Sequence, residues 1–350
     1  MFPEAVLVTG PNGFIGLHVL NHALKRGWNV VAPVRSDRAV NRITSIFPAE
    51  SASSQIKIVK IQGIVKSEYF KPAFEAAPVT AVINTASPIV YDVDDVAADI
   101  LHPAIDSATA ILEASAAYGG SSLKRVVHVS SGGAVMDPTL GPAPGKNYTW
   151  DDWNPVTFEQ AVAGGAQLAY ITSKGLSEKA FWKWLDDHSS AGFDLVSVAP
   201  AAVFGPQFLG ALEGKETVDL KGLPLSLATI WSIAFPGAET NFHMGGWVYV
   251  GDRAESLARA VTTPEASGLR ILATERCHWQ LIRDVARRVV PELKGRIDEG
   301  EPGLAEREKD STYDMDGSRL TSVLGVDYTP IDVALKEAYE QILAAEKAQS

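Results

Sequence analysis

Residues 4–16, Glu-Ala-Val-Leu-Val-Thr-Gly-Pro-Asn-Gly-Phe-Ile-Gly, constrain the fold of this chain more than any other stretch. The apolar, β-branched run at 5–8 predicts a buried strand. Three glycines follow at a spacing of three, and the apolar positions of 14–25 then take a helical period. Backbone N–H groups in such a turn approach a diphosphate closely, and the helix N-terminus adds a positive partial charge. We therefore predict a diphosphate-binding turn, with a purely structural glycine turn as the alternative.

Strand-like and helix-like segments alternate over the first two hundred residues. The pattern predicts further strands at 28–34, 56–61, 79–85, 123–131 and 193–199, and long helices at 92–118 and 166–188. Alternation at this short spacing predicts an α/β fold, a Rossmann-type doubly wound parallel sheet with helices on both faces. Such a sheet binds its ligands at the carboxyl ends of the strands.

The end of the second predicted strand indicates which dinucleotide binds. Sites that prefer NAD place an acidic side chain there, to bind the ribose 2′-hydroxyl. This chain instead has Arg35 and Arg38, with Asp37 between them as a possible ion-pair partner. Guanidinium groups suit a 2′-phosphate through bidentate, charge-assisted hydrogen bonds. The residues predict NADP(H) as the cofactor, and the alternative is two solvated arginines at the start of a surface helix.

Beyond about residue 200 the alternation weakens. Residues 200–225 resemble a loop, 247–250 and 269–273 resemble short strands, and helices are expected at 252–263, 280–290 and 331–347. We expect an NADP-binding Rossmann domain formed by 1–203 plus about 241–270. A smaller C-terminal substrate-binding lobe would comprise about 204–240 plus 271–350.

Composition excludes several classes of partner. The formal net charge of −11 opposes binding to nucleic acid and to anionic membrane surfaces. The longest apolar region, 223–238, is too short and too interrupted to span a bilayer. The single cysteine cannot form an internal disulfide, and the seven histidines show no metal-ligand spacing. We expect no signal peptide before the first strand. We expect a cytoplasmic protein without a metal that acts on a small molecule, as a monomer or a homodimer.

A tyrosine and a lysine lie four residues apart on the predicted helix 166–188. At this spacing Tyr170 and Lys174 share one helix face. A phenol has a pKa near 10, and a neighbouring ammonium group lowers it, which makes the tyrosine a usable general acid. Ser130 and Ser131 end the fifth strand on the ligand side of the sheet, where a hydroxyl can bind a substrate carbonyl. The structural alternative is a chance Tyr/Lys pair on an exposed helix and a strand-end serine turn.

These signals, at these spacings, resemble the extended short-chain dehydrogenase/reductase superfamily along nearly the whole chain. Finer motifs resemble its dihydroflavonol reductase and cinnamoyl-CoA reductase subgroup, and most of all the yeast-type methylglyoxal/carbonyl (aldehyde) reductases. The motifs are Val-Arg-Ser at 34–36, Thr-Ala-Ser-Pro at 85–88, Val-Ser-Ser-Gly-Gly-Ala-Val-Met-Asp-Pro at 129–138, Trp-Asp-Asp-Trp-Asn-Pro at 150–155 and Pro-Ala-Ala-Val-Phe-Gly-Pro at 200–206.

The resemblance implies a mechanism and a set of site residues. Tyr170 would donate a proton, Lys174 would bind the nicotinamide ribose and lower the tyrosine pKa, and Ser131, rather than Ser130, would polarise the carbonyl. Substrate contacts would come from the loop after residue 88, the segment after residue 136 and the region 204–231. The implied cofactor-binding residues are Gly10, Asn12, Gly13, Phe14, Ile15, Gly16, Arg35, Arg38, Thr85, Ala86, Ser87, Tyr170, Lys174, Pro200, Ala201 and Val203.

Two positions depart from the subgroup's pattern. Residues 63–65 lack the Asp that often contacts adenine, and Tyr249 with Gly251 replaces an Asp or His and an Arg. Neither departure touches the catalytic set. We therefore predict an NADPH-dependent carbonyl reductase that converts an aldehyde or ketone to an alcohol by hydride transfer. The alternatives are an NAD(P)-dependent sugar epimerase or dehydratase of the same superfamily, and a non-catalytic NADP-sensing protein.

Overall fold

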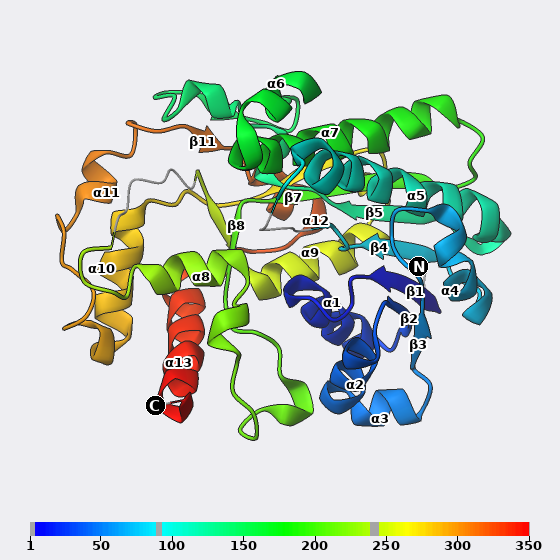
Figure 1. The fold of residues 1–350 in the computed structure, drawn as a ribbon, viewed down its shortest axis with the longest axis horizontal. Coiled ribbons are helices and arrows are strands. Elements are labelled where there is room, and N and C mark those ends of the chain that lie inside the picture. Colours follow the sequence, from blue (N-terminus) through cyan, green and yellow to red (C-terminus); the bar gives the residue numbers. More distant parts are fainter. Residues whose placement is uncertain (1–3, 89–92, 239–244, 350) are drawn as a thin grey trace.

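A computed structural model describes residues 4–88, 93–238 and 245–349, and its centre is a seven-stranded sheet (Figure 1). The strand order is β10-β7-β5-β4-β1-β2-β3, and every neighbouring pair is parallel. The strands are β1 Ala5–Thr9, β2 Asn29–Val34, β3 Ile56–Lys60, β4 Ala81–Asn84, β5 Arg125–Val129, β7 Asp194–Pro200 and β10 Arg270–Ala273. The predicted Rossmann-type parallel sheet is confirmed.

Helices cover both faces of the sheet because successive strand residues point to opposite sides. In β1, Val6 and Val8 face a cluster that includes α1, α2, α9 and α12, whereas Leu7 faces a cluster that includes α4, α5 and α7. The helices are α1 Phe14–Lys25, α2 Asp37–Ile46, α3 Pro48–Ala52, α4 Lys71–Ala76, α5 His102–Tyr118, α7 Gly165–Asp187, α9 Val250–Thr262 and α12 Ser318–Leu324. This two-faced burial explains why most strands read as continuous apolar runs.

A second hydrophobic cluster lies beyond the sheet, where α8 Leu225–Ser232, α10 Trp279–Val289 and α13 Ile331–Gln349 pack together (Figure 1). The short strands β8 Ala202–Phe204 and β9 Trp247–Tyr249 pair in parallel, and the rings of Phe204 and Trp247, which belong to this cluster, stack with their centres 5.9 Å apart. Another small parallel pair joins β6 Asn147–Tyr148 to β11 Asp314–Met315. The remaining helices are α6 Phe158–Ala163 and α11 Leu304–Arg307.

Short turns of 3₁₀ helix connect these elements. They are η1 Ser67–Phe70, η3 Gly120–Ser122, η4 Gly132–Ala134, η5 Pro138–Leu140, η6 Gly210–Leu212, η7 Leu220–Gly222, η8 Pro264–Ala266 and η9 Pro291–Leu293. A π-helical turn, η2 Ala97–Leu101, leads into α5. In the described ranges, no helix is long and apolar enough to cross a membrane.

The structure differs from the sequence predictions in three places. Strand β9 pairs with β8 outside the main sheet, and the expected loop 200–225 contains β8 itself. The first residue of the helix expected at 92–118 lies outside the described ranges. Within them, α5 begins at His102, directly after the π-helical turn. Strands of two or three residues are too short for the period-2 pattern to reveal them.

The C-terminal part of the chain returns to the main sheet after the expected domain boundary near residue 270. Strand β10 is the edge strand of that sheet, and Leu320 and Leu324 of α12 pack in its core. The last hundred residues are thus divided between the sheet and the α8–α10–α13 cluster. The expected division into two domains stays a prediction.

Candidate active site

The glycine turn after β1 has no room for a side chain at Gly10 or Gly16. Gly10 has a φ of +61°, and a Cβ on Gly16 would lie 2.1 Å from the carbonyl oxygen of Gly10. The Gly13 N–H donates to the same oxygen at 3.1 Å, and α1 begins directly afterwards. Thr85 Oγ1 donates to the carbonyl oxygen of Thr9 at 2.6 Å. The turn, the N-terminus of α1 and the end of β4 therefore form one packed unit with exposed backbone N–H groups.

A cleft of about 710 Å³ lies over this unit, at the carboxyl ends of the parallel strands. It is lined by every predicted catalytic and cofactor-binding residue except Arg38. Ile61 and Ile64, which sequence reasoning missed, also line it, and their position just after β3 was the available signal. The segment 221–226 and Ala228 contribute to the wall as well, within the region 204–231 expected to contact substrate.

The two arginines that predicted NADP(H) occupy different places. Arg35 follows β2, is exposed and lines the cleft, whereas Arg38 lies in the first turn of α2 and is not among the lining residues. Asp37 pairs with Lys60, with Nζ and Oδ1 2.9 Å apart, so it does not neutralise Arg35. Within the described ranges, the guanidinium group of Arg35 has no ion-pair partner.

Tyr170 and Lys174 lie one turn apart on α7, as the helical spacing predicted. Lys174 Nζ is 4.9 Å from the centre of the Tyr170 ring and donates to Ser87 Oγ at 3.0 Å. Burial lowers the pKa of Lys174 from its usual value to about 8. The ammonium group is therefore close enough to the phenol ring to favour its ionised form.

The two serines make different hydrogen bonds. Ser130 is buried, and its Oγ donates to Glu178 Oε2 at 2.6 Å. Ser131 is half-buried and its Oγ accepts from the Gly133 N–H at 3.2 Å, which leaves the hydroxyl proton for another acceptor. Only Ser131 is placed to donate to a molecule beside Tyr170, because the hydroxyl proton of Ser130 is already used.

A buried ion pair that the sequence analysis did not predict is hydrogen-bonded to Ser130 and connects α7 to the sheet. Glu178, fully buried on α7, is 3.0 Å from Arg270 Nε of β10 and also accepts from Ser197 Oγ of β7. Burial opposes ionisation of Glu178, but the charge and hydrogen bonds of Arg270 and the serine hydroxyls hold its pKa below the usual value. The guanidinium of Arg270 also lies 3.5 Å over the Trp153 ring. The pair thus joins α7 to the middle of β7, to the first residue of β10 and to Ser130 just after β5.

A smaller cavity of about 150 Å³ adjoins the cleft, since Ser131, Tyr170, Lys174 and Ala201 line both spaces. Its remaining lining is apolar or glycine: Gly132, Gly133, Met136, Ile171, Ala202 and Met315. Met136 directly precedes the segment that was expected to contact substrate, whereas Met315 comes from β11 and was not anticipated.

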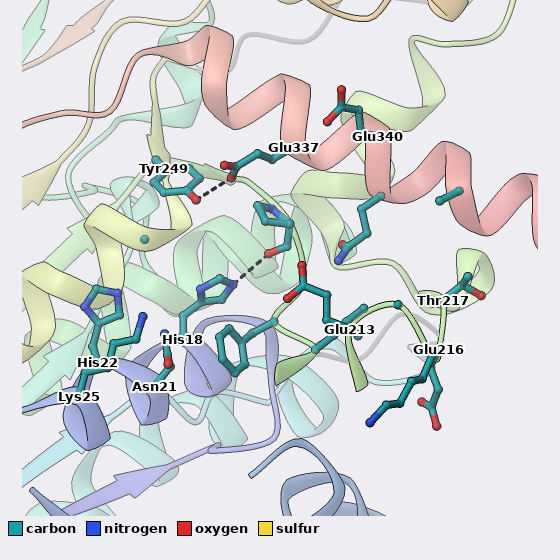
Figure 2. Close-up of a pocket in the computed structure, with 18 of the residues that line it drawn as sticks. His18, Asn21, His22, Lys25, Glu213, Glu216, Thr217, Tyr249, Glu337 and Glu340 are labelled. Carbon is teal, nitrogen blue, oxygen red and sulfur yellow. Dashed lines mark hydrogen bonds between the residues drawn. The ribbon is translucent and has the colours of Figure 1, made fainter. Parts of the chain in front are cut away.

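A third space, of about 940 Å³, lies between α1, α9, α13 and the loop 206–217 (Figure 2). Tyr249, one of the departures from the subgroup pattern, forms part of its wall and donates to Glu337 Oε2 at 2.7 Å. Gly251, which departs from the pattern together with Tyr249, makes room for the Tyr249 ring, because a Cβ on Gly251 would lie 2.4 Å from it. Ser131, Tyr170 and Lys174 do not line this space, so it is separate from the candidate active site.

Other reactive groups do not form a site in the described ranges. No group of three or more His, Cys, Asp or Glu residues there is placed to hold a metal ion. Cys277 is buried, and burial raises the pKa of its thiol to about 12, which makes it a poor nucleophile at neutral pH.

Reductases are among the known proteins that are similar to this chain in sequence and in structure. The chain is 29% identical over 348 residues to the NADPH-dependent methylglyoxal reductase GRE2 of Saccharomyces cerevisiae, covering 98% of this chain and 99% of that protein. It is 28% identical to the ketoreductase azaE of Aspergillus niger, over 97% of this chain and 98% of that protein. The solved structure of yeast methylglyoxal/isovaleraldehyde reductase Gre2 complexed with NADPH superposes with a TM-score of 0.89 at 28% identity, covering 98% of this chain and 99% of that one.

The sequence pattern of a protein family matches as well. Residues 6–271, which include the glycine turn, Ser131, Tyr170 and Lys174, match the NAD dependent epimerase/dehydratase family. This match confirms the predicted resemblance to the extended short-chain dehydrogenases/reductases. The chain is a member of the NAD dependent epimerase/dehydratase family.

Proposed function

We propose that this protein is an NADPH-dependent carbonyl reductase that converts an aldehyde or ketone to an alcohol. One observation carries the proposal: Ser131, Tyr170 and Lys174 line both a dinucleotide-sized cleft and a small cavity beside it. A cofactor in the first space and a carbonyl compound in the second would meet at these three side chains. The names of the similar proteins, a methylglyoxal reductase and a ketoreductase, support the same reaction class.

The residues present fit NADPH. The turn from Gly10 to Gly16 is so tight that a Cβ at its last glycine would clash with the Gly10 carbonyl oxygen, and its glycines line the cleft, as a diphosphate site requires. Arg35 would hold the 2′-phosphate, and Ile61 with Ile64 would contact the adenine. Thr85, Ala86, Ser87 and the segment Pro200, Ala201 and Val203 would line the path to the nicotinamide. Arg38, outside the cleft wall, would add only longer-range attraction.

The chain's own residues would direct the reaction as follows. When bound, NADPH supplies a hydride to the carbonyl carbon. The Ser131 hydroxyl donates a hydrogen bond to the carbonyl oxygen and polarises it. The Tyr170 hydroxyl transfers its proton to the same oxygen as negative charge develops there, so hydride and proton together yield the alcohol. Lys174 stabilises the tyrosinate that remains until solvent returns the proton.

Replacing Arg35 by alanine is expected to reduce the preference for NADPH over NADH. Loss of a charge-assisted bond to the 2′-phosphate should raise the Kd for NADPH by about 10- to 100-fold, while the Kd for NADH changes little. Fluorescence titration of both cofactors measures this ratio. Arg38→Ala is the matched control and should leave the ratio nearly unchanged. Equal effects of the two substitutions would contradict the assignment of Arg35.

The pH dependence should reflect Lys174, whose pKa is lowered to about 8 by burial. The ammonium form exists below this pKa, so kcat/KM for NADPH, which reports the free enzyme, should fall as the pH rises through about 8. In Lys174→Arg the group stays charged, so activity should be lower but this alkaline decline should disappear. An unchanged decline in the variant would assign it to another group.

The function itself is tested by NADPH depletion across aldehydes, diketones, ketoesters and aryl ketones, with analysis of the alcohol products. The proposal expects turnover of small aldehydes or ketones and release of free cofactor on gel filtration. Tightly retained cofactor with no turnover would instead support an epimerase or dehydratase. Inactivity on the whole panel with free NADPH exchange would support a cofactor-sensing protein.

We further propose a cytoplasmic location and a monomeric or homodimeric state. A single buried cysteine without a disulfide partner suits a reducing compartment. The acidic net charge of −11 argues against nucleic-acid and membrane partners. Size-exclusion chromatography with light scattering distinguishes the two assembly states.

A further inference from the structure

The small cavity is the part of the candidate site that distinguishes one carbonyl compound from another. Its volume is about 150 Å³, and apart from Ser131, Tyr170 and Lys174 its described lining is apolar or glycine. Because those three side chains also face the cofactor cleft, a carbonyl carbon placed between them would project one substituent into the small cavity. The walls of this space would therefore limit the size of that substituent.

One wall of the small cavity is formed by a residue from the C-terminal part of the chain, Met315. Met315, on β11, is 6% exposed, and its Sδ and Cε lie 3.1 and 3.2 Å from the position of a Cβ on Gly132. Gly132 directly follows Ser131, so the thioether packs against the backbone beside the proposed carbonyl-polarising hydroxyl. The missing side chain at Gly132 is what permits this close approach.

The backbone that carries Met315 is held by several contacts. Met315 pairs with Tyr148 of β6, and the Tyr313 N–H donates to the carbonyl oxygen of Pro142 at 2.6 Å. Asp314 accepts from Arg276 at 2.9 Å, and the Tyr313 hydroxyl contacts Met136 Sδ at 3.6 Å. With the backbone held on this side, the shape of the wall depends mainly on the side chain at position 315.

We propose that Met315 sets the size limit for the substituent of the substrate carbonyl; this inference rests on the proposed function. An apolar protein cavity of about 150 Å³ accommodates a molecule of the size of benzene. The favoured substrates are therefore aldehydes or ketones with a compact, uncharged apolar substituent of up to about six carbons. A charged substituent is disfavoured because the described walls offer it no partner beyond the reacting groups.

The test compares kcat/KM for acetaldehyde, isovaleraldehyde and 2-naphthaldehyde in variants at this position. Met315→Ala should raise the ratio of 2-naphthaldehyde to isovaleraldehyde by about tenfold or more, because it removes part of the wall. Met315→Trp should lower kcat/KM for isovaleraldehyde by about tenfold while that for acetaldehyde changes little. Met315→Leu, which nearly conserves volume, is the matched control and should keep all ratios within about threefold.

The Kd for NADPH and the thermal midpoint of each variant separate selectivity from folding. If Met315→Ala does not fold, the expected loss of kcat/KM for isovaleraldehyde in Met315→Trp still tests the inference. Folded variants in which all three aldehydes change by the same factor would show that Met315 only packs the wall, and the inference would be wrong. If the wild type is active and the variants keep its substrate ratios, only the inference is wrong. If the wild type is inactive, the proposed function is wrong as well.

Discussion

Tyr170→Phe is expected to lower kcat for carbonyl reduction by about 10²–10⁴-fold, the usual contribution of a general acid. The substitution removes only the phenolic hydroxyl, and the ring stays beside Lys174 Nζ, which lies 4.9 Å from its centre. Among the described residues that line the small cavity, no other side chain carries a phenolic proton, and the other polar groups are those of Ser131 and Lys174. Stopped-flow or steady-state NADPH oxidation with the best substrate measures the loss.

Cofactor binding provides the internal control for this variant. The glycine turn and Arg35 are far from the removed atom in the sequence and belong to other elements, so the Kd for NADPH should stay within about threefold. Tyr118→Phe, on α5 and outside both spaces, is the matched substitution and should retain full activity. Turnover by Tyr170→Phe close to that of the wild type would exclude Tyr170 as the proton donor.

Of the substitutions described, Arg270→Met is expected to lower the free energy of unfolding most, by about 3–5 kcal/mol. It leaves the buried Glu178 carboxylate without its cation. The pKa of Glu178 would then rise above its unfolded-state value. A raised carboxyl pKa favours the folded state at low pH, so the variant should lose stability as the pH rises from about 5 to 8. Urea unfolding at the two pH values measures this dependence.

The double variant Arg270→Met with Glu178→Gln distinguishes the charge from simple loss of packing. Removing the carboxylate as well should recover part of the stability and abolish the pH dependence that Arg270→Met introduced, because the Glu178 carboxyl that caused it is gone. Its kcat should remain below that of the wild type, since Glu178 also orients Ser130 next to Ser131. Equal stability of the single and double variants would show that the ion pair does not contribute through its charge.

The parts of the fold that the sequence predicted well are those set by neighbouring residues. The strand–glycine turn–helix unit, the pairing of Tyr170 with Lys174 on one helix face, and the placement of Arg35 after β2 all follow from local periodicity and chain direction. In a parallel sheet the strand ends meet at one edge, so the predicted ends of β1, β4, β5 and β7 also placed most of the cofactor cleft.

Other features depend on contacts between distant segments, which no local pattern reports. The pairing of β8 with β9, the use of Ser130 in the Glu178 network, and the arrival of Met315 at the small cavity are of this kind. Arg270 and Glu178 are separated by 92 residues, and either side chain read by itself resembles an ordinary surface charge.

The sequence by itself thus determined the phosphate-binding turn, the fold class and the Tyr/Lys pair, because each rests on backbone geometry within a few residues of the motif. Only the tertiary structure showed that the Ser130 hydroxyl is bonded to Glu178 while Ser131 lines the small cavity, that Arg35 and not Arg38 lines the cleft, and which side chains bound the small cavity. These choices depend on how separate elements pack against one another, and packing of distant segments leaves no periodic signal in either one.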